Sequence, residues 1–345
     1  MSGALVVVAP GLADSLQDLG RRGLARFGVP PAGALDAEAL ALANALVGAE
    51  PGRAALEMRF LGPTLRVEAE SVRLAVAGAA VEMRVTTADG GEATAPGWRS
   101  TTLRRGDRVA VGPLRGASTA YLAVAGGFAA PAVYGSAAAY PRAGLGGFDG
   151  AGGGGGAGAR LALVAASAPE GPERAAPAPD WGPPARARVV FGPQEARFTA
   201  DARALFLATD WRVSQSADRM GLRLEGPRLA HEGGADITSD GVVSGAIQVP
   251  ASGQPILLLA DRQTAGGYAK IAAVITADLP AMGRLAPGDP LRFAEVSLAE
   301  AREALAAADA AQARRLAAVA PLGGLDQAAL YDANLISGVT AGGEG

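Results

Sequence analysis

Residues 245–275 read GAIQVPASGQPILLLADRQTAGGYAKIAAVI, a stretch dense in short apolar runs. It holds three short apolar runs, GAIQVP, PILLLAD and KIAAVI, which are separated by glycine, proline and polar residues. Runs of this length between turn residues are typical of β-strands. The stretch therefore predicts successive strands joined by turns.

The same pattern continues outward through most of the chain before residue 297. Other short apolar or alternating runs are ALVVVAP (4–10), TLRVEA (64–69), VRLAVAG (72–78), VEMRVTT (81–87), RVAVG (108–112), AYLAVAGG (120–127) and ARVVFGP (187–193). Their number and close spacing favour closed or sandwiched β-structure over a sheet of alternating strands and helices. We therefore predict a mainly β protein.

Two segments carry a helical pattern instead. Residues 35–48 place apolar side chains at helical spacing, and Gly48 is a plausible C-terminal stop. Residues 298–319 follow Ser297, a candidate N-cap, and Glu300 completes the pattern of a capping box. We expect a few helices in all, one of them at the C-terminal end.

A low-complexity stretch separates two regions with similar short motifs. Residues 149–184 hold a glycine tract and then a Pro/Ala-rich tract, which is typical of a flexible and then stiffer spacer. GPTL and LRRGDRVAV before it resemble GPRL and LAPGDPLRF after it, in the same order, which suggests duplicated β domains. We predict a first domain over 1–148, a linker over 149–184, a second domain over 185–297 and a helical tail over 298–345.

Composition excludes several classes of function. The chain has no cysteine, which excludes disulfides, thiol catalysis and Cys-ligated metals. Its single histidine, His231, excludes multi-His metal sites and argues against a Ser-His-Asp triad, so we predict no metal site. The net charge is −3 and the arginines are spread along the chain, which argues against nucleic acid or a membrane surface as partner.

Other motifs are missing from the sequence. The N-terminus lacks the basic start of a signal peptide, and no stretch reaches the ~18 apolar residues of a membrane span, so we expect a soluble, cytoplasmic protein. The phosphate-binding pattern GxxxxGK[ST] does not occur, and the glycines near 145–156 have no strand–helix context for a dinucleotide. The chain also lacks the MKM motif that carries biotin on a lysine.

One basic residue stands apart from all the others. The chain has 31 basic residues, and Lys270 is the only lysine among them. The composition of the chain strongly favours arginine over lysine, so a lysine that only carried surface charge would readily be replaced by arginine. Lys270 is therefore a candidate functional residue. Lysine provides a compact charge whose pKa shifts when it is partly buried.

Polar residues precede Lys270 at a predicted junction of strand, turn and strand. Asp261, Arg262, Gln263 and Thr264 supply donors and acceptors at four consecutive positions. Gly266 and Gly267 allow the backbone to approach a ligand, and Tyr268 can cover a ring or donate its hydroxyl. The segment predicts the floor of a polar pocket, and the alternative is a hairpin turn with ordinary polar residues.

Two amides stand out in otherwise apolar segments. Gln248 lies between Ile247 and Val249 and faces away from both in a strand, either into a site or into solvent. Asn44 is the polar exception in the helix over 35–48, and the alternative to a site role is again a solvent-facing position. Asp36 can act as a favourable negative charge at the start of that helix.

These residues carry a resemblance to a known family. The segments VVAPGLADSLQDLGRRGLARFGVPPAGALDAEALALANALVG, ALEMRFLGPTL, AYLAVAGGF, SADRMGLRLEGP and LAPGDPLRF, together with 245–275, resemble the biotin-dependent carboxyltransferase family, also called the allophanate hydrolase subunit 2 or KipA family. The resemblance covers about residues 5–297 in order. It implies two cyclophilin-like β-barrel domains.

The resemblance implies three possible activities. A free-standing chain of this length resembles the C subunit of 5-oxoprolinase, which acts with a KipI-like partner and a LamB/YcsF-like partner in the ATP-dependent opening of 5-oxoproline to glutamate. Within urea carboxylase the same module takes CO₂ from carboxybiotin. KipA-type members also pair with a KipI-like protein in regulation. The 5-oxoprolinase interpretation is favoured because no biotin carboxylase, biotinyl or amidohydrolase region is attached.

The chain departs from the family pattern at one segment. Residues 135–147 read GSAAAYPRAGLGG where relatives usually have GSRSTxxRAGxGG, so Ala137, Ala138 and Ala139 replace polar residues. If those polar groups contact ligand in relatives, this chain has altered or reduced activity.

A catalytic hypothesis follows from these residues. Both enzymatic interpretations require donors aimed at a carbonyl or ureido oxygen that gains negative charge. We expect Lys270, Arg219 and the backbone at Gly266 and Gly267 to be those donors. Asp218 or Asp261 would orient Lys270 or accept a proton, and Tyr268 would close over the ligand. Gln248, Thr264 and Asn44 complete the expected binding residues.

Overall fold

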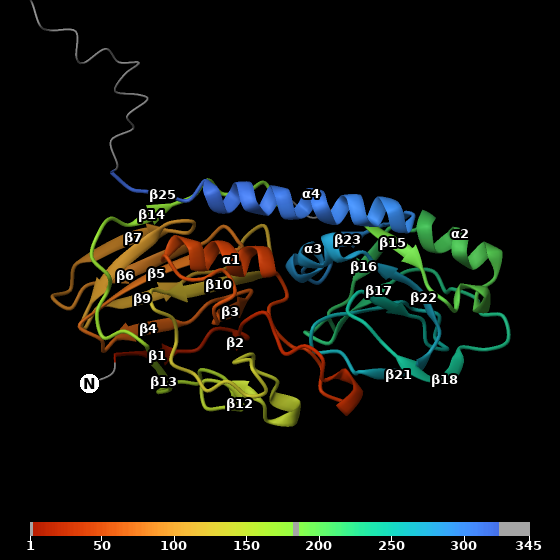
Figure 1. Ribbon diagram of the computed structural model, residues 1–345, viewed down its shortest axis with the longest axis horizontal. Coiled ribbons are helices and arrows are strands. Elements are labelled where there is room, and N and C mark those ends of the chain that lie inside the picture. The colour runs from red at the N-terminus through yellow and green to blue at the C-terminus, as the bar shows by residue number, and fades with distance from the viewer. Residues whose placement is uncertain (1–2, 182–185, 324–345) are drawn as a thin grey trace, which may run out of the picture.

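The computed structural model describes residues 3–181 and 186–323, and its sheets confirm the mainly β fold. Figure 1 shows two β-rich halves side by side with a long C-terminal helix across both. The first half is built on a six-stranded and a five-stranded sheet, and the second on one eight-stranded sheet that is nearly closed into a barrel. All the apolar runs quoted above as strands contain a strand.

The sheets of the first half enclose one apolar core. The six-stranded sheet has the order β13-β1-β4-β9-β6-β7, and the five-stranded sheet the order β2-β3-β10-β5-β8. Their strands are β1 (Ala4–Ala9), β2 (Ser15–Gln17), β3 (Ala55–Arg59), β4 (Thr64–Val67), β5 (Ser71–Ala77), β6 (Glu82–Thr86), β7 (Glu92–Pro96), β8 (Ser100–Arg104), β9 (Arg108–Val111), β10 (Thr119–Val124) and β13 (Arg160–Ala162). Side chains from both sheets, such as Leu5, Leu65, Leu56 and Leu122, form this core.

The first predicted helix packs on the outer face of the five-stranded sheet. Helix α1 (Ala37–Leu46) begins after Asp36, whose carboxylate accepts hydrogen bonds from the backbone N–H groups of Glu38 and Ala39, both at 3.1 Å. Its Leu40 and Leu46 lie in an apolar cluster with Tyr121 of β10. The helix ends just before Gly48, whose positive φ of 75° makes it a suitable stop.

The eight-stranded sheet of the second half has the order β23-β16-β17-β20-β19-β22-β15-β24. Its strands are β15 (Ala187–Phe191), β16 (Trp211–Val213), β17 (Gly221–Glu225), β19 (Ala246–Gln248), β20 (Ile256–Leu258), β22 (Lys270–Val274), β23 (Pro290–Leu291) and β24 (Phe293–Glu295). Helix α2 (Ala200–Ala208) contributes Phe206 to its core, where this ring stacks on Phe293 at 4.5 Å. The sequence analysis did not identify α2 or the short helix α3 (Leu279–Arg284).

Smaller elements complete the chain. Two-stranded sheets join β11 (Gly146–Gly147) to β12 (Ala151–Gly153), β14 (Arg174–Ala175) to β25 (Ala320–Pro321), and β18 (Asp236–Gly241) to β21 (Ala265–Tyr268). Short 3-10 helices are η1 (Ala25–Phe27), η2 (Pro141–Ala143), η3 (Glu195–Arg197) and η4 (Thr276–Asp278).

The expected spacer is only partly a spacer. β13 lies inside the 149–184 stretch, pairs with β1 and buries Leu161 in the first core, because this short run carries apolar side chains between the low-complexity tracts. The domain boundaries proposed from the sequence stay a prediction.

The C-terminal helix connects the two halves. Helix α4 (Leu298–Ala317) starts with the predicted capping box of Ser297 and Glu300. Near its end, Gln312 Nε2 donates to Glu38 O of α1 at 3.0 Å, and β25 then pairs with β14. The helical tail predicted over 298–345 is confirmed as far as Ala317, and residues 324–345 lie outside the described residues.

A buried ion pair at the start of α1 also crosses between the halves. Arg284 at the end of α3 binds the N-cap Asp36, with 2.6 Å between Nε and Oδ2, and also reaches Glu38 at 2.6 Å. The Arg284 guanidinium lies 3.9 Å from the centre of the Trp181 ring. Leu35, next to the N-cap, packs into the core of the second half. The start of α1 is therefore fixed by both halves.

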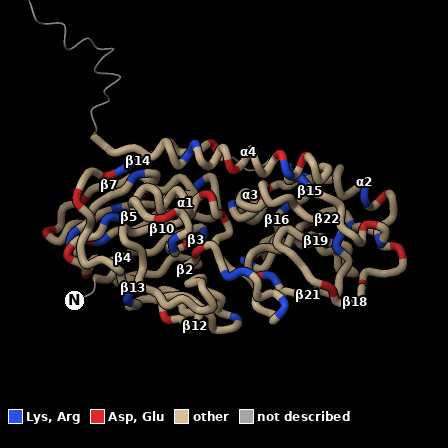
Figure 2. Tube along the Cα trace, viewed as in Figure 1, with Lys and Arg blue, Asp and Glu red and all other residues tan. Residues whose placement is uncertain are grey.

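Charged residues are scattered over the whole trace in Figure 2 and do not gather on one face. None of the helices in the described part of the chain is long and apolar enough to cross a membrane.

Candidate functional site

A buried ion pair joins two of the predicted catalytic residues. Arg219 precedes β17 and Asp261 follows β20, and these strands are neighbours in the sheet. Arg219 binds Asp261 in a bidentate manner, with Nε–Oδ2 at 2.9 Å and Nη2–Oδ1 at 3.0 Å. Asp261 is only 6% exposed, so this is a buried pair.

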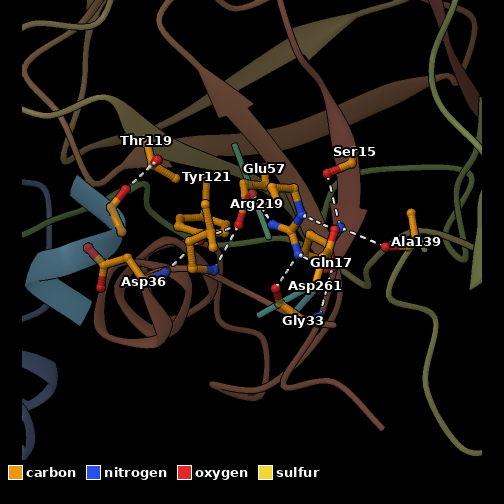
Figure 3. Close-up of polar contacts among 12 residues, drawn as sticks. Ser15, Gln17, Gly33, Asp36, Glu57, Thr119, Tyr121, Ala139, Arg219 and Asp261 are labelled. Atoms are coloured by element: carbon orange, nitrogen blue, oxygen red, sulfur yellow. Dashed lines mark hydrogen bonds and ion pairs between the residues drawn. The ribbon is translucent and has the colours of Figure 1, made fainter. Parts of the chain in front are cut away.

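The first half supplies the other side of this pair. Glu57 of β3 is fully buried, and its Oε1 contacts Arg219 Nη1 directly. Tyr121 donates its hydroxyl hydrogen to Glu57 Oε2 at 2.6 Å, and Leu35 N–H donates to the same oxygen at 3.0 Å. Figure 3 shows how Arg219 lies between Glu57 and Asp261. We call Glu57, Tyr121, Arg219 and Asp261 the junction cluster.

Two carboxylates share one guanidinium in the junction cluster, and this sets its protonation. Burial alone would lower the pKa of Arg219, but Glu57 and Asp261 raise it above its usual value. Burial raises the pKa of Asp261, and Arg219 only partly opposes this effect. Burial and the nearby Glu57 carboxylate raise the pKa of Tyr121. Arg219 therefore stays charged, while Asp261 can accept a proton more readily than an ordinary aspartate.

A second cluster surrounds the single lysine. Lys270 opens β22 and is 7% exposed, and its Nζ binds Asp240 Oδ2 of β18 at 3.1 Å. The Asp240 side chain is 52% exposed, and the hydrogen bond from Lys270 lowers its pKa. We call Lys270 and Asp240 the ribbon pair, because Asp240 belongs to the two-stranded β18–β21 ribbon.

Gln248 lies beside the ribbon pair and is buried rather than solvent-facing. It is opposite Lys270 in the register of β19 and β22, and only 2% of it is exposed. Gln263 Nε2 donates to Gln248 Oε1 at 3.0 Å, whereas Gln248 Nε2 is buried without a partner among the described residues. A Cβ at Gly266 would collide with Gln248 Nε2, so a side chain there would have to move the amide from its present position.

The other predicted residues of this stretch lie on the ribbon. Gly266, Gly267 and Tyr268 belong to β21, and the Thr264 carbonyl accepts a hydrogen bond from Val242 N–H at 3.0 Å. The Tyr268 side chain is exposed and lines a shallow surface hollow with Pro250 and Gln254.

The structure changes two of the expected roles. Neither Asp218 nor Asp261 orients Lys270, because Asp261 binds Arg219 and the lysine reaches Asp240 instead. Arg219 is not a free donor, because Glu57, Asp261 and the Gly33 carbonyl, which accepts from Nη2 at 2.7 Å, occupy its fork. Two of the hydrogen bonds of Arg219 go to the Asp261 carboxylate.

Asp218 and Asn44 stand apart from both clusters. Asp218 is exposed, and its Oδ1 accepts hydrogen bonds from Met220 and Gly221 N–H groups, which stabilises the turn before β17. Asn44 is buried and donates to Arg53 O at 2.7 Å, so it fixes the loop after α1 and is not solvent-facing.

The alanines that replace the family's polar residues, Ala137 to Ala139, lie in the first half near β2. Ala138 and Ala139 are buried, and their carbonyls accept hydrogen bonds from Arg21 Nη2 and Gln17 Nε2. This segment uses its backbone carbonyls where side-chain polar groups are absent.

Sequence reasoning missed three residues of the site. Glu57 and Tyr121 were hidden in strands, and their partner Arg219 lies 162 positions from Glu57, so no local pattern links them. Asp240 lies 30 positions before Lys270, and no spacing pattern links the two. A charged residue inside the apolar run ALEMRF was the one available hint at Glu57.

A cavity of about 610 Å³ lies between the halves beside α4. Its walls are mainly apolar, with residues from α1, α3, α4 and the segment around Leu259. In the described residues, no group of three or more acidic or histidine side chains is arranged to hold a metal ion.

The family comparison covers most of the chain. A family model described as the carboxyltransferase domain, subdomain A and B, matches residues 27–295. The C subunit of 5-oxoprolinase from Escherichia coli (strain K12) is 33% identical over 300 residues, which cover 87% of this chain and 94% of that protein. The protein of the same name from Haemophilus influenzae is 33% identical over 287 residues, which cover 83% of this chain and 89% of that protein.

A solved structure of a longer protein also matches. The crystal structure of the Kluyveromyces lactis urea carboxylase aligns with a TM-score of 0.78 and 29% identity over 90% of this chain. Only 29% of that enzyme's chain is covered. The match therefore extends to one part of a much longer enzyme.

Proposed function

This chain belongs to the carboxyltransferase-domain family, subdomains A and B, and from that premise we propose that it is the C subunit of an ATP-dependent 5-oxoprolinase, which opens 5-oxoproline to glutamate. The observation that carries the proposal is the extent of the match. It includes 94% of the Escherichia coli protein, but only 18% of the yeast urea amidolyase. A chain of this kind works together with other chains.

The junction cluster supports a proton-accepting role for Asp261. Opening the lactam ring adds water to a carbonyl carbon, and the attacking water must lose a proton. Asp261 is held by Arg219, and its raised pKa brings it closer to the working pH than an ordinary aspartate. Glu57 and Tyr121 position Arg219 and do not themselves need to touch substrate.

The ribbon pair supports the stabilisation of negative charge on the carbonyl oxygen of the lactam. Lys270 Nζ is a nearly buried cation, and Gln248 Nε2 is a buried donor without a partner among the described residues. Donors aimed at a developing oxyanion typically contribute about 10²–10³ in rate. Lys270 and Gln248 are our proposed donors, with Gly266 leaving room for the Gln248 amide.

The described residues do not fit a phosphate site of the glycine-rich loop type. The tract near 150–156 contains β12, which pairs with β11, and the next element is strand β13, so no helix N-terminus follows the tract directly to receive phosphate. We therefore propose that ATP is used in the assembled complex, whose other chains are a KipI-like protein and a LamB/YcsF-like protein. No step on this chain is assigned to ATP.

The second candidate is a biotin-dependent carboxyl transfer, and the likeness of 90% of this chain to the urea carboxylase structure favours it. In this alternative the carboxyl group comes from carboxybiotin. The Lys270 and Gln248 nitrogen atoms would face its ureido oxygen as CO₂ leaves.

The test is ATP-dependent release of glutamate from 5-oxoproline by the chain co-expressed with its genomic neighbours. We expect turnover by the wild type and its loss with Lys270→Ala. A stable complex without turnover would move the assignment to carboxyl transfer or to the KipA-type regulatory role, and biotin-dependent carboxylation of urea would then be measured.

A further inference from the structure

Arg262 is a buried cation without a counter-charge in the described part of the chain. The residue is 6% exposed, and its Nε and Nη1 atoms are buried with no hydrogen-bond partner among the described residues. Burial lowers the pKa of Arg262, and no described charge opposes this effect. Buried arginines are almost always paired, because an unpaired buried charge is costly.

Two other buried arginines have a nitrogen without a partner among the described residues, but both are compensated. Arg21 donates to Ala138 O, and Asp18 and Asp261 favour its charged form. Arg59 lies close to Glu57, which favours its charged form as well. Arg262 differs from both, because no nearby carboxylate among the described residues favours its charged form. Contacts within the fold therefore do not account for this buried guanidinium.

The position of Arg262 connects it to both clusters of the site. Its neighbour Asp261 belongs to the junction cluster, and its other neighbour Gln263 donates to Gln248 at 3.0 Å. Gln263 and Thr264 are half-buried turn residues. The backbone that follows Arg262 therefore lies nearer the surface than the buried strand β22.

We propose that Arg262 binds a carboxylate of the substrate. The planar guanidinium offers two parallel N–H groups that match the two oxygens of a carboxylate. The inference rests on the proposed function and deepens it, because 5-oxoproline carries a carboxylate on its ring and urea is neutral. Arg262 is then a specificity-determining residue that selects an anionic lactam, while Gln248 Nε2 serves a second acceptor atom.

A pair of matched ligands tests this selectivity. The probes are 5-oxoproline and 5-oxoprolinamide, which is the same ring with a neutral carboxamide. Binding of each to the full-length chain is measured by calorimetry. We expect the wild type to prefer the acid by about ten- to a hundredfold, the range of a hydrogen-bonded charged pair, and Arg262→Gln to bring the two affinities close together.

The control is Arg302→Gln, which removes the same charge from an exposed position on α4. It should leave the preference for the acid unchanged. A wild type without preference, or an Arg262→Gln chain that keeps it, overturns the inference.

The melting temperature without ligand gives a second test. A ligand-binding role and a fold-supporting role of Arg262 predict opposite changes in it. Without ligand, Arg262→Met should raise the melting temperature, because it replaces an unpaired buried charge with an apolar side chain of similar length. A lower melting temperature would mean that the guanidinium supports the fold, which also counts against the inference.

The two proposals can fail separately. Absence of glutamate release by the assembled wild type contradicts the proposed function. The preference for acid over amide is a binding measurement on the chain itself, so it still decides the role of Arg262.

Discussion

The junction cluster and the ribbon pair are both made of opposite charges, but they lie in opposite surroundings. In the junction cluster, Glu57 and Asp261 are both buried around Arg219, and the contacts come from both halves. In the ribbon pair, Lys270 is buried but its partner Asp240 is half exposed on a two-stranded ribbon. The first arrangement shields both carboxylates from water, whereas the second leaves its carboxylate in contact with water.

This difference separates positioning residues from residues free to react. Removing one partner of a buried pair leaves an uncompensated charge, so the loss of any member of the junction cluster is costly. Lys270 is itself buried, so a ligand that replaces the half-exposed Asp240 carboxylate must supply an acceptor for its Nζ. We therefore propose charge stabilisation for Lys270 and the placement of Asp261 for Arg219.

The largest expected effect breaks the junction cluster. Arg219→Ala leaves the buried carboxylates of Glu57 and Asp261 without a cation, and we expect the free energy of unfolding to fall by about 3–5 kcal/mol. Urea denaturation of the full chain measures it. The matched control is Arg223→Ala, an exposed arginine on β17, which should change little. A loss below about 1 kcal/mol, as at a surface pair, would contradict the comparison.

The second prediction concerns the ribbon pair. Lys270→Met keeps the apolar stem and removes the charge, so we expect turnover by the assembled complex to fall by about 10²–10³. The midpoint of urea unfolding should stay close to that of the wild type. Lys270→Arg sharpens the test, because the sequence-based hypothesis requires a compact charge. Full activity of Lys270→Arg would show that any cation suffices.

A third prediction uses a partly buried carboxylate outside both clusters. Burial raises the pKa of Asp14 to about 6, and its Oδ1 has no partner in the described part of the chain. A raised folded pKa means that the folded state holds the proton more tightly, so stability is fully present below about pH 4 and falls as the pH rises to about 6. We expect a loss of about 1–2 kcal/mol over this window, after allowance for partial exposure. Asp14→Asn should flatten this part of the stability–pH curve, and an unchanged curve would contradict the assignment.

The smallest expected effect also lies outside both clusters, at the cap of α4. Ser297→Ala removes the hydroxyl that accepts from Glu300 N–H at 3.2 Å, which should cost about 1 kcal/mol. Hydrogen exchange of α4 should increase while exchange in β17 and β20 stays unchanged. Faster exchange in those strands would mean that the junction depends on α4.

The sequence predicted the elements whose signals are local. Short apolar runs between glycines and prolines identified the strands, and the Ser297–Glu300 box identified the start of α4. Helix α2 was missed although Thr199 caps it, with its hydroxyl accepting from Ala202 N–H at 3.1 Å. Its nine residues give too short a pattern to stand out from the neighbouring strands.

Only the site residues from the 245–275 stretch were predictable from the sequence, and their partners from other strands were not. Gln248, Asp261 and Lys270 all lie within the continuous stretch 245–275, so they could be named as a group. Their partners Glu57, Tyr121 and Asp240 come from strands whose pairing no local rule fixes. The resemblance to a family supplied Arg219 as a candidate, but its role in holding Asp261 required the three-dimensional arrangement.

The sharing of charges between the halves has a consequence for protein synthesis. Asp36 and Glu57 are made early, whereas their cations, Arg284 and Arg219, are made only after the whole first half has left the ribosome. The strand that pairs with β14 is made later still, at Ala320–Pro321. The first half therefore emerges with its inner carboxylates still hydrated, and it reaches its final form only when the last third of the chain has been translated.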